Sequence, residues 1–82
     1  MIKEEELTDP DSCICRAHPR EMVFVLLARD ADAPGTIRDW IKRRIASGKN
    51  KDGDPLMTEA EQCAQVMEFQ FRTQREHFIN NR

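Results

Sequence analysis

The chain has 82 residues, a length that allows one domain with a small hydrophobic core. Hydrophobic residues make up 39% and charged residues 34% of the sequence, which is the composition of a folding chain and excludes a wholly disordered one. The formal net charge of −2 argues against nucleic acid as a partner, because general DNA coating needs a strongly basic domain.

The first residues carry charge rather than a targeting signal. Met1-Ile2-Lys3-Glu4-Glu5-Glu6 lacks the apolar stretch of a secretory signal peptide, and no apolar run approaches the ~18 residues of a membrane span. We therefore expect a cytoplasmic protein with no membrane partner, whose three cysteines stay reduced.

Residues 1–18 show no helical period and are first acidic, then rich in cysteine. The cluster Asp9-Pro10-Asp11-Ser12 is typical of a turn, so we predict an extended or partly ordered N-terminal arm. Cys13-x-Cys15-x-x-His18 offers three metal ligands, and Cys63 or His77 would have to be the fourth. The one-residue gap between the cysteines departs from the usual zinc frameworks. Free thiols are the alternative, and we predict no metal and no other cofactor.

Residues 19–82 form the predicted helical domain, and residues 19–30 its first helix. Pro19 suits a first helical turn, and the apolar run from Met22 to Ala28 fits either a buried helix or a buried strand. Val and Phe favour a strand. Because a lone short strand has no evident partner elsewhere in the chain, we predict a helix that lies centrally or at an oligomer interface.

Residues 33–47 are predicted to form the second helix. Asp32 is placed to cap it and Pro34 falls in its first turn, while Gly48 suits the position that ends a helix. Ile37, Ile41 and Ile45 recur on one stripe, which predicts the face that packs against the rest of the domain.

The third predicted helix begins at Thr58. Thr58-Glu59-Ala60-Glu61 matches a capping box, in which the hydroxyl and the carboxylate each satisfy a free backbone N–H. Val66 and Phe69 lie off the apolar stripe and widen it, which indicates a second contact. The stripe itself is formed by Ala60, Cys63, Ala64, Met67, Phe71 and Phe78.

A local basic face on the second predicted helix is the best candidate for ligand binding. Arg38 and Lys42 are four residues apart and share a helix face, with Arg43 nearby and Arg29 just before the helix. Guanidinium groups offer forked donors that suit phosphate oxygens, and the single Trp40 could stack on a base. A solvated helix face, partly paired with Asp39 and the acidic arm, is the alternative interpretation.

Catalytic patterns are weak in this sequence. A nucleophilic Cys–His pair needs a shaped pocket and a third, orienting group, which a small helical domain rarely offers. The acidic residues fit solvated or capping positions better than acid–base work. We therefore predict that the protein is not an enzyme.

Part of the chain resembles small accessory proteins of tailed bacteriophages, which are mostly uncharacterised. The resemblance covers residues 22–69 and excludes the cysteine-containing arm and the C-terminal tail. Its motifs are Phe24-Val25-Leu26 before Asp30, then Ala33-Pro34, Ile37-Arg38 and Trp40, followed by Ala60, Ala64 and Met67-Glu68. The resemblance implies a non-enzymatic protein that counters host immunity in the cytoplasm of an infected bacterium.

Together these observations predict an all-α fold, a small three-helix domain completed by oligomerisation. The leading functional hypothesis is sequestration of an anionic nucleotide signal at a subunit interface by Arg29, Arg38, Trp40, Lys42 and Arg43. One alternative is a protein–protein inhibitor of a host defence effector of the CRISPR or restriction type. It would act through its acidic arm (Glu4, Glu5, Glu6) or its exposed apolar residues (Phe69, Phe71). A small DNA-binding regulator is the further alternative.

Overall fold

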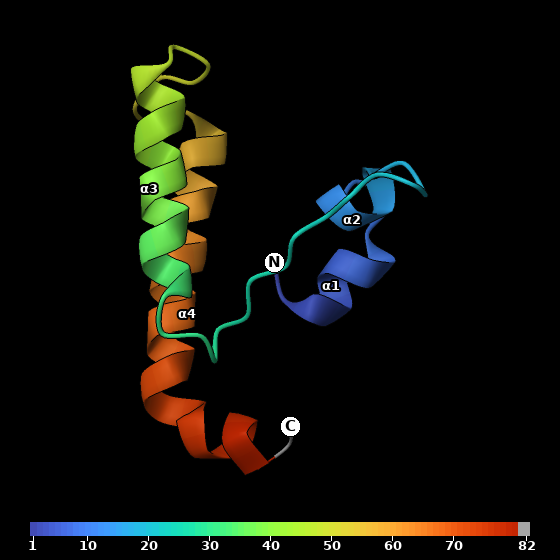
Figure 1. The fold of residues 1–82 in the computed structure, drawn as a ribbon, viewed down its shortest axis with the longest axis vertical. Coiled ribbons are helices and arrows are strands. Elements are labelled where there is room, and N and C mark those ends of the chain that lie inside the picture. Colours follow the sequence, from blue (N-terminus) through green and yellow to red (C-terminus); the bar gives the residue numbers. More distant parts are fainter. Residues whose placement is uncertain (81–82) are drawn as a thin grey trace.

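A computed structural model describes the backbone of residues 1–80 and the side chains of residues 1–74. Over residues 1–80 the chain is helical without any strand, which confirms the predicted all-α class. Figure 1 shows its helices, α1 (Lys3–Thr8), α2 (Cys13–Arg16), α3 (Ala33–Ala46) and α4 (Pro55–Asn80). The molecule is elongated, with extents of 41 × 28 × 19 Å.

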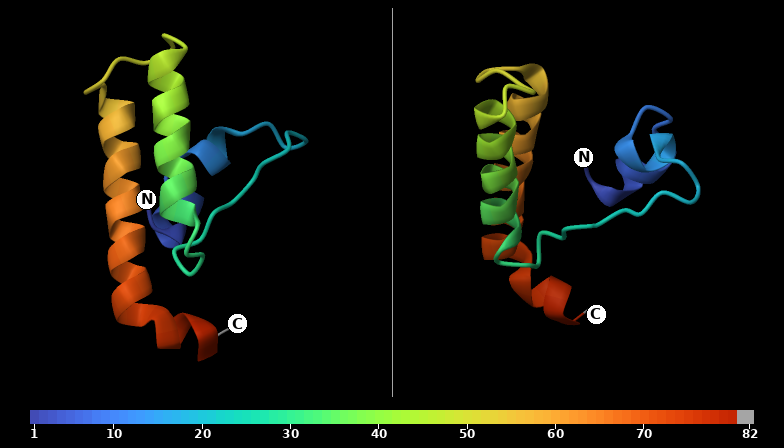
Figure 2. Two further views of the ribbon diagram at one scale, coloured as in Figure 1. Left: turned by 60° about the vertical axis from the view of Figure 1, so that its left-hand side comes forward. Right: turned by 45° about the horizontal axis from the view of Figure 1, so that its top comes forward.

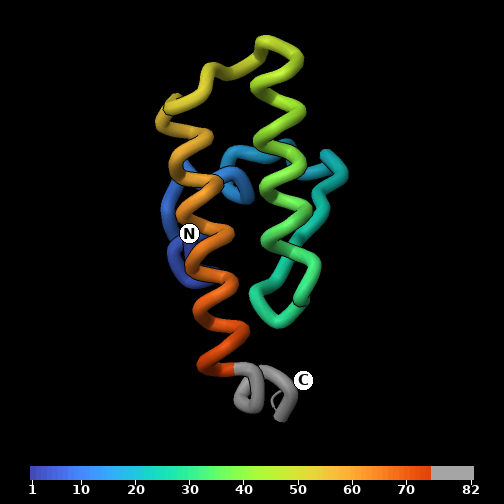
Figure 3. The backbone as a smooth tube through the Cα atoms, turned by 90° about the vertical axis from the view of Figure 1, so that its left-hand side faces the viewer, coloured from blue at the N-terminus to red at the C-terminus, as the bar shows by residue number. Residues whose placement is uncertain are grey.

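Helices α3 and α4 form an antiparallel hairpin, seen side by side in Figures 1 and 3. The buried apolar side chains in the described part of the molecule are small or flexible, namely Ala33, Pro34, Met57 and Ala64. Alanine lets two helix backbones approach closely, and methionine fills irregular gaps. The core is therefore thin, and most of the larger apolar side chains remain at least partly exposed.

Local signals place α3 as predicted. It ends at Ala46, and Gly48 follows with a φ of 76°, a left-handed conformation that glycine adopts without steric cost. The N–H of Gly48 donates to the carbonyl of Ile45 and that of Lys49 to Arg44, which is the Schellman arrangement. At the other end, the Asp32 side chain makes no capping hydrogen bond, contrary to our expectation.

Helix α4 begins three residues before the predicted Thr58. The N–H of Thr58 donates to the carbonyl of Asp54 at 2.9 Å, and Pro55 occupies the first helical position, where its missing N–H costs nothing. The prediction of a capping box is therefore wrong, because Thr58 and Glu61 lie inside the helix. The signal that starts the helix is Asp54-Pro55.

The predicted helix over residues 19–30 is wrong. Residues 22–27 have an extended backbone that links α2 to α3, visible as the long connection in Figure 2. Val23, Phe24 and Val25 lose side-chain freedom in a helix. Their side chains are 49%, 86% and 63% exposed, so burial does not offset that loss. The N–H of Asp30 donates to the carbonyl of Leu27, and this turn ends the segment before α3 begins.

Residues 1–18, predicted to be an extended or partly ordered arm, contain the short helices α1 and α2, which contact each other. Ser12 joins them: its hydroxyl accepts from the N–H of Cys15 and donates to the carbonyl of Glu6. Ser12 is also the buried polar residue of the described chain. A serine that caps α2 and bonds α1 holds two helices that would be too short to persist alone.

Among the described residues, none of the helices has both the length and the apolar character that a membrane span requires.

Candidate binding surfaces

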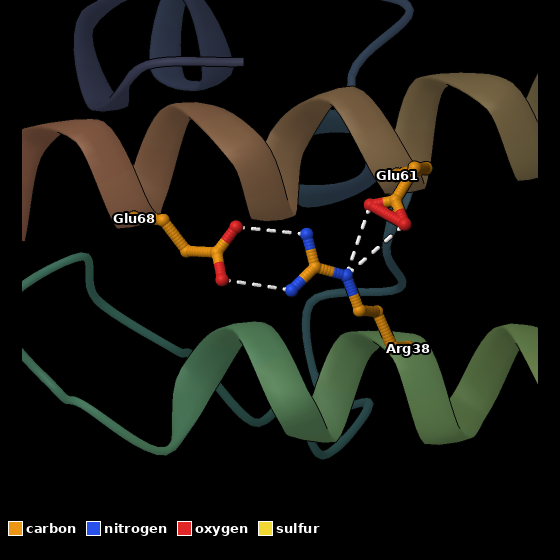
Figure 4. A network of polar contacts seen from close by, with 3 residues as sticks. All are labelled: Arg38, Glu61 and Glu68. Atoms are coloured by element: carbon orange, nitrogen blue, oxygen red, sulfur yellow. Dashed lines mark hydrogen bonds and ion pairs between the residues drawn. The ribbon is translucent and has the colours of Figure 1, made fainter.

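Arg38 connects α3 to α4 through two carboxylates, as Figure 4 shows. Its two terminal nitrogens donate to the two carboxylate oxygens of Glu68, each at 2.8 Å. Its Nε lies 3.0 Å from both oxygens of Glu61. Glu61 and Glu68 are seven positions apart in the sequence and so share one face of α4. All three side chains are partly exposed.

We call Arg38, Glu61 and Glu68 the clamp, and its hydrogen bonds stabilise the charged forms of Arg38 and Glu68. Hydrogen bonding to Glu68, and then to Glu61, raises the pKa of Arg38, while the same bond from Arg38 lowers the pKa of Glu68. The guanidinium keeps its charge in any case. Because two carboxylates surround it, Arg38 presents little positive potential to an incoming phosphate.

The other members of the predicted basic face are divided between internal and open positions. Arg44 lies over the Trp40 ring, 5.3 Å from its centroid, and its Nε donates to Asn50 at 2.7 Å. Trp40, Lys42 and Arg43 are exposed. Arg29 lies in the turn before α3, so the structure places it at the N-terminal end of that helix.

A shallow groove of about 530 Å³ lies beside the clamp, and we call it the loop groove. Arg38 and Lys42 contribute two positive charges to its lining, while Asp52 and Glu61 contribute two negative ones. The groove is therefore electrically balanced, and its carboxylates would repel a phosphate placed next to Lys42.

A second groove, of about 600 Å³, lies between α4, the first residues of the chain and the end of the extended segment. We call it the α4 groove. Apolar side chains dominate its lining, whereas its charged members balance in sign. Its apolar lining includes Met1, Ile2, Leu26, Leu27, Val66 and Met67.

The predicted protein-interaction residues occupy two separate regions. Phe69 is 55% exposed and Val66, which lines the α4 groove, is 49% exposed, so the apolar surface of α4 continues beyond that groove. Phe71 is partly buried and already has an internal interaction. Glu4, Glu5 and Glu6 lie in the first turn of α1, and Glu6 accepts a hydrogen bond from the N–H of Ile14 at 2.9 Å.

The cysteine motif is not gathered around a common point. Cys13 and Cys15 are exposed free thiols and Cys63 is a partly buried one. The Nδ1 of His18 accepts from the N–H of Arg20. No cluster of three or more metal-ligating side chains occurs among the described residues. The side chains of His77 and Phe78 lie outside that range.

Sequence reasoning missed the two glutamates of the clamp. Glu61 and Glu68 occupy one face of a predicted helix at a spacing of two turns, and this was the available signal. The capping-box interpretation assigned Glu61 to the backbone, and Arg38 was matched with phosphate rather than with α4. The Met1 and Ile2 side chains of the α4 groove carried no local signal.

No protein-family model, no curated protein and no solved structure gives a significant match to this chain.

Proposed function

We propose that this chain is a non-enzymatic protein-binding module that receives an apolar segment of a partner in the α4 groove. The observation that carries the proposal is the placement of its apolar side chains. The buried core uses Ala33, Met57 and Ala64, while Val66 and Phe69 on α4 stay about half exposed. Contiguous exposed apolar surface of this kind marks interaction sites in small proteins.

The shape of the α4 groove supports this proposal. Its volume of about 600 Å³ falls in the range of binding pockets, roughly 300–1,000 Å³. Met67, Val66 and Leu26 in its lining are apolar side chains of differing shape, and methionine adapts to a partner's contour. A groove of this type suits an amphipathic helix, whose apolar residues recur every three or four positions.

The biological setting of the proposal rests on the bacteriophage resemblance alone. In that setting the partner is a host defence protein, and occupation of its apolar segment blocks its activity without any chemistry. The acidic residues Glu4 and Glu5 of α1 lie exposed near the same groove, and would steer a partner with a basic flank.

A site-specific cross-linking experiment tests the module. A photoreactive residue at position 66, inside the groove, should capture a defined host protein, whereas the same residue at Lys49 in the α3–α4 loop should not. The captured protein, once purified, should bind the wild type and lose at least tenfold in affinity for Val66→Asp, because a buried charge without a partner opposes binding. Equal binding of the wild type and Val66→Asp would refute the proposal.

The second candidate function is sequestration of an anionic nucleotide on α3. It is favoured by one local arrangement, in which the exposed Trp40 lies close in sequence to the exposed cations Lys42 and Arg43. Arg38 contributes less than the sequence indicated, because Glu61 and Glu68 hold it.

The single tryptophan makes this second candidate easy to measure. Stacking of a base on Trp40 should change its fluorescence as a panel of linear and cyclic nucleotides is titrated. Lys42→Glu together with Arg43→Glu should abolish the change, and Lys49→Glu together with Lys51→Glu serves as the charge-matched control. No response to any nucleotide would remove this candidate and leave the protein-binding module.

A further inference from the structure

The extended segment of residues 22–27 exposes apolar side chains and an unpaired backbone at the same place. Met22 is 93% exposed, Phe24 86% and Val25 63%. The backbone N–H and C=O groups of residues 22–26 make no hydrogen bond to any other described residue. Such a segment has the pairing capacity of an open sheet edge, and its Val-Phe-Val composition favours a strand.

We propose that a second copy of this chain pairs with the segment, so that two copies of residues 22–28 form an antiparallel two-stranded ribbon about a twofold axis. The inference goes beyond the proposed function, because the ribbon joins two copies of the module. The two sites share Leu26 and Leu27, which also line the α4 groove.

Symmetry restricts the register of this ribbon. In an antiparallel pair, directly opposed residues lie on the same face, and side chains alternate between faces along each strand. A twofold axis perpendicular to the ribbon places each residue of the second copy on the same face of the ribbon as its equivalent in the first copy. A residue can therefore oppose only residues whose number has the same parity, and the ribbon must be centred on a residue, either Phe24 or Val25.

Charge selects between these two centres. A ribbon centred on Val25 brings Arg20 of one copy toward Asp30 of the other at each end of the paired segment. A ribbon centred on Phe24 places Glu21 opposite Leu27 and brings no opposite charges together. Opposite charges across a strand pair stabilise it, so the sequence that flanks the segment fits a second copy in the Val25-centred register.

The apolar residues then pair in an orderly way. Phe24 opposes Leu26 of the second copy on one face, and Val23 opposes Leu27 on the other. Val25 opposes itself at the axis. Aromatic–aliphatic and β-branched pairs of this kind contribute to strand pairing. The pairing also brings Phe24 and Val25, which are 86% and 63% exposed in the monomer, into contact with apolar side chains.

Cysteine cross-linking tests both the ribbon and its register in the full-length chain. In a background where Cys13, Cys15 and Cys63 are replaced by serine, Val25→Cys should form an intermolecular disulfide under mild oxidation, because directly opposed Cβ atoms lie within disulfide reach. Val23→Cys alone should not, since its two copies are offset along the strands. Mixing Val23→Cys with Leu27→Cys should restore the cross-link. Equal cross-linking of Val25→Cys and Val23→Cys alone would overturn the register.

Charge exchange provides the second test. Arg20→Asp and Asp30→Arg should each weaken self-association about tenfold in sedimentation experiments, because each creates two like-charged pairs per dimer. A mixture of these two variants should form a heterodimer in preference to either homodimer. A monomeric wild type, or a mixture without preference, would overturn the proposal. Unchanged helical circular dichroism in each variant shows that the α3–α4 hairpin remains folded.

Discussion

Arg38 and Glu68 face each other across the α3–α4 hairpin and are joined by two parallel hydrogen bonds of 2.8 Å each. This bidentate geometry orders both side chains, and Glu61 adds a contact to the Nε of Arg38. Because the hairpin has a thin apolar core, this polar clamp specifies how the two helices are aligned along their length.

Replacement of Arg38 should therefore destabilise the hairpin. Arg38→Ala removes the cation that the carboxylates of Glu61 and Glu68 share, and we expect a lower melting temperature by circular dichroism. Arg38→Lys should recover only part of the loss, since an ammonium cannot form the fork. The control is Lys42→Ala, an exposed cation one turn along α3. An equal loss in Lys42→Ala would show that the clamp adds nothing specific.

The clamp also predicts a dependence of stability on pH. The hydrogen bonds from Arg38 lower the pKa of Glu68 below its ordinary value of 4.5. Glu68 therefore adds to the free energy of unfolding above about pH 4.5. This contribution is lost as the pH falls through the lowered pKa that Glu68 has in the folded state. Urea unfolding between neutral and acid pH should show this decline. In Glu68→Gln the decline should be shallower, and an identical slope would contradict the assignment.

Ala64 is fully buried and lies on the same face of α4 as Glu61 and Glu68, which bind Arg38 of α3. Ala64→Leu should separate the helices and cost about 1–3 kcal/mol of unfolding free energy, the usual range for overpacking. Gln65→Leu makes a similar change at the next, exposed position and should cost less than about 0.5 kcal/mol. Denaturant titration measures both, and equal effects would mean that Ala64 is not a packing contact.

Two glycines near the ends of α3 should respond in opposite directions to alanine. Gly48→Ala forces a Cβ into a backbone with φ of 76° and should destabilise the protein by roughly 1–2 kcal/mol. Gly35 lies within α3 with open space around it and no positive φ. Gly35→Ala should stabilise the protein by about 0.5–1 kcal/mol. Thermal unfolding of both variants checks the signs, and a stabilising Gly48→Ala would refute the helix-ending role.

Local sequence signals were sufficient for α3 and for most of α4. The glycine at position 48 and the proline at position 34 act within one helical turn, and the boundaries they predicted for α3 agree with the structure within a residue. Of the apolar stripe predicted on α4, Ala64 is buried, whereas Cys63 and Met67 line the α4 groove. The start of α4 was misplaced because two local signals compete there, and Asp54-Pro55 prevails over Thr58.

The sequence alone thus determined the helical class and the position of α3, because propensities, capping and periodicity act over a few residues. Only the tertiary structure decided the partners of Arg38, which lie 23 and 30 residues away in the chain. It also decided the conformation of residues 22–27. An apolar run forms a helix when its surroundings bury it, and here the hairpin of α3 and α4 completes its small core without that segment.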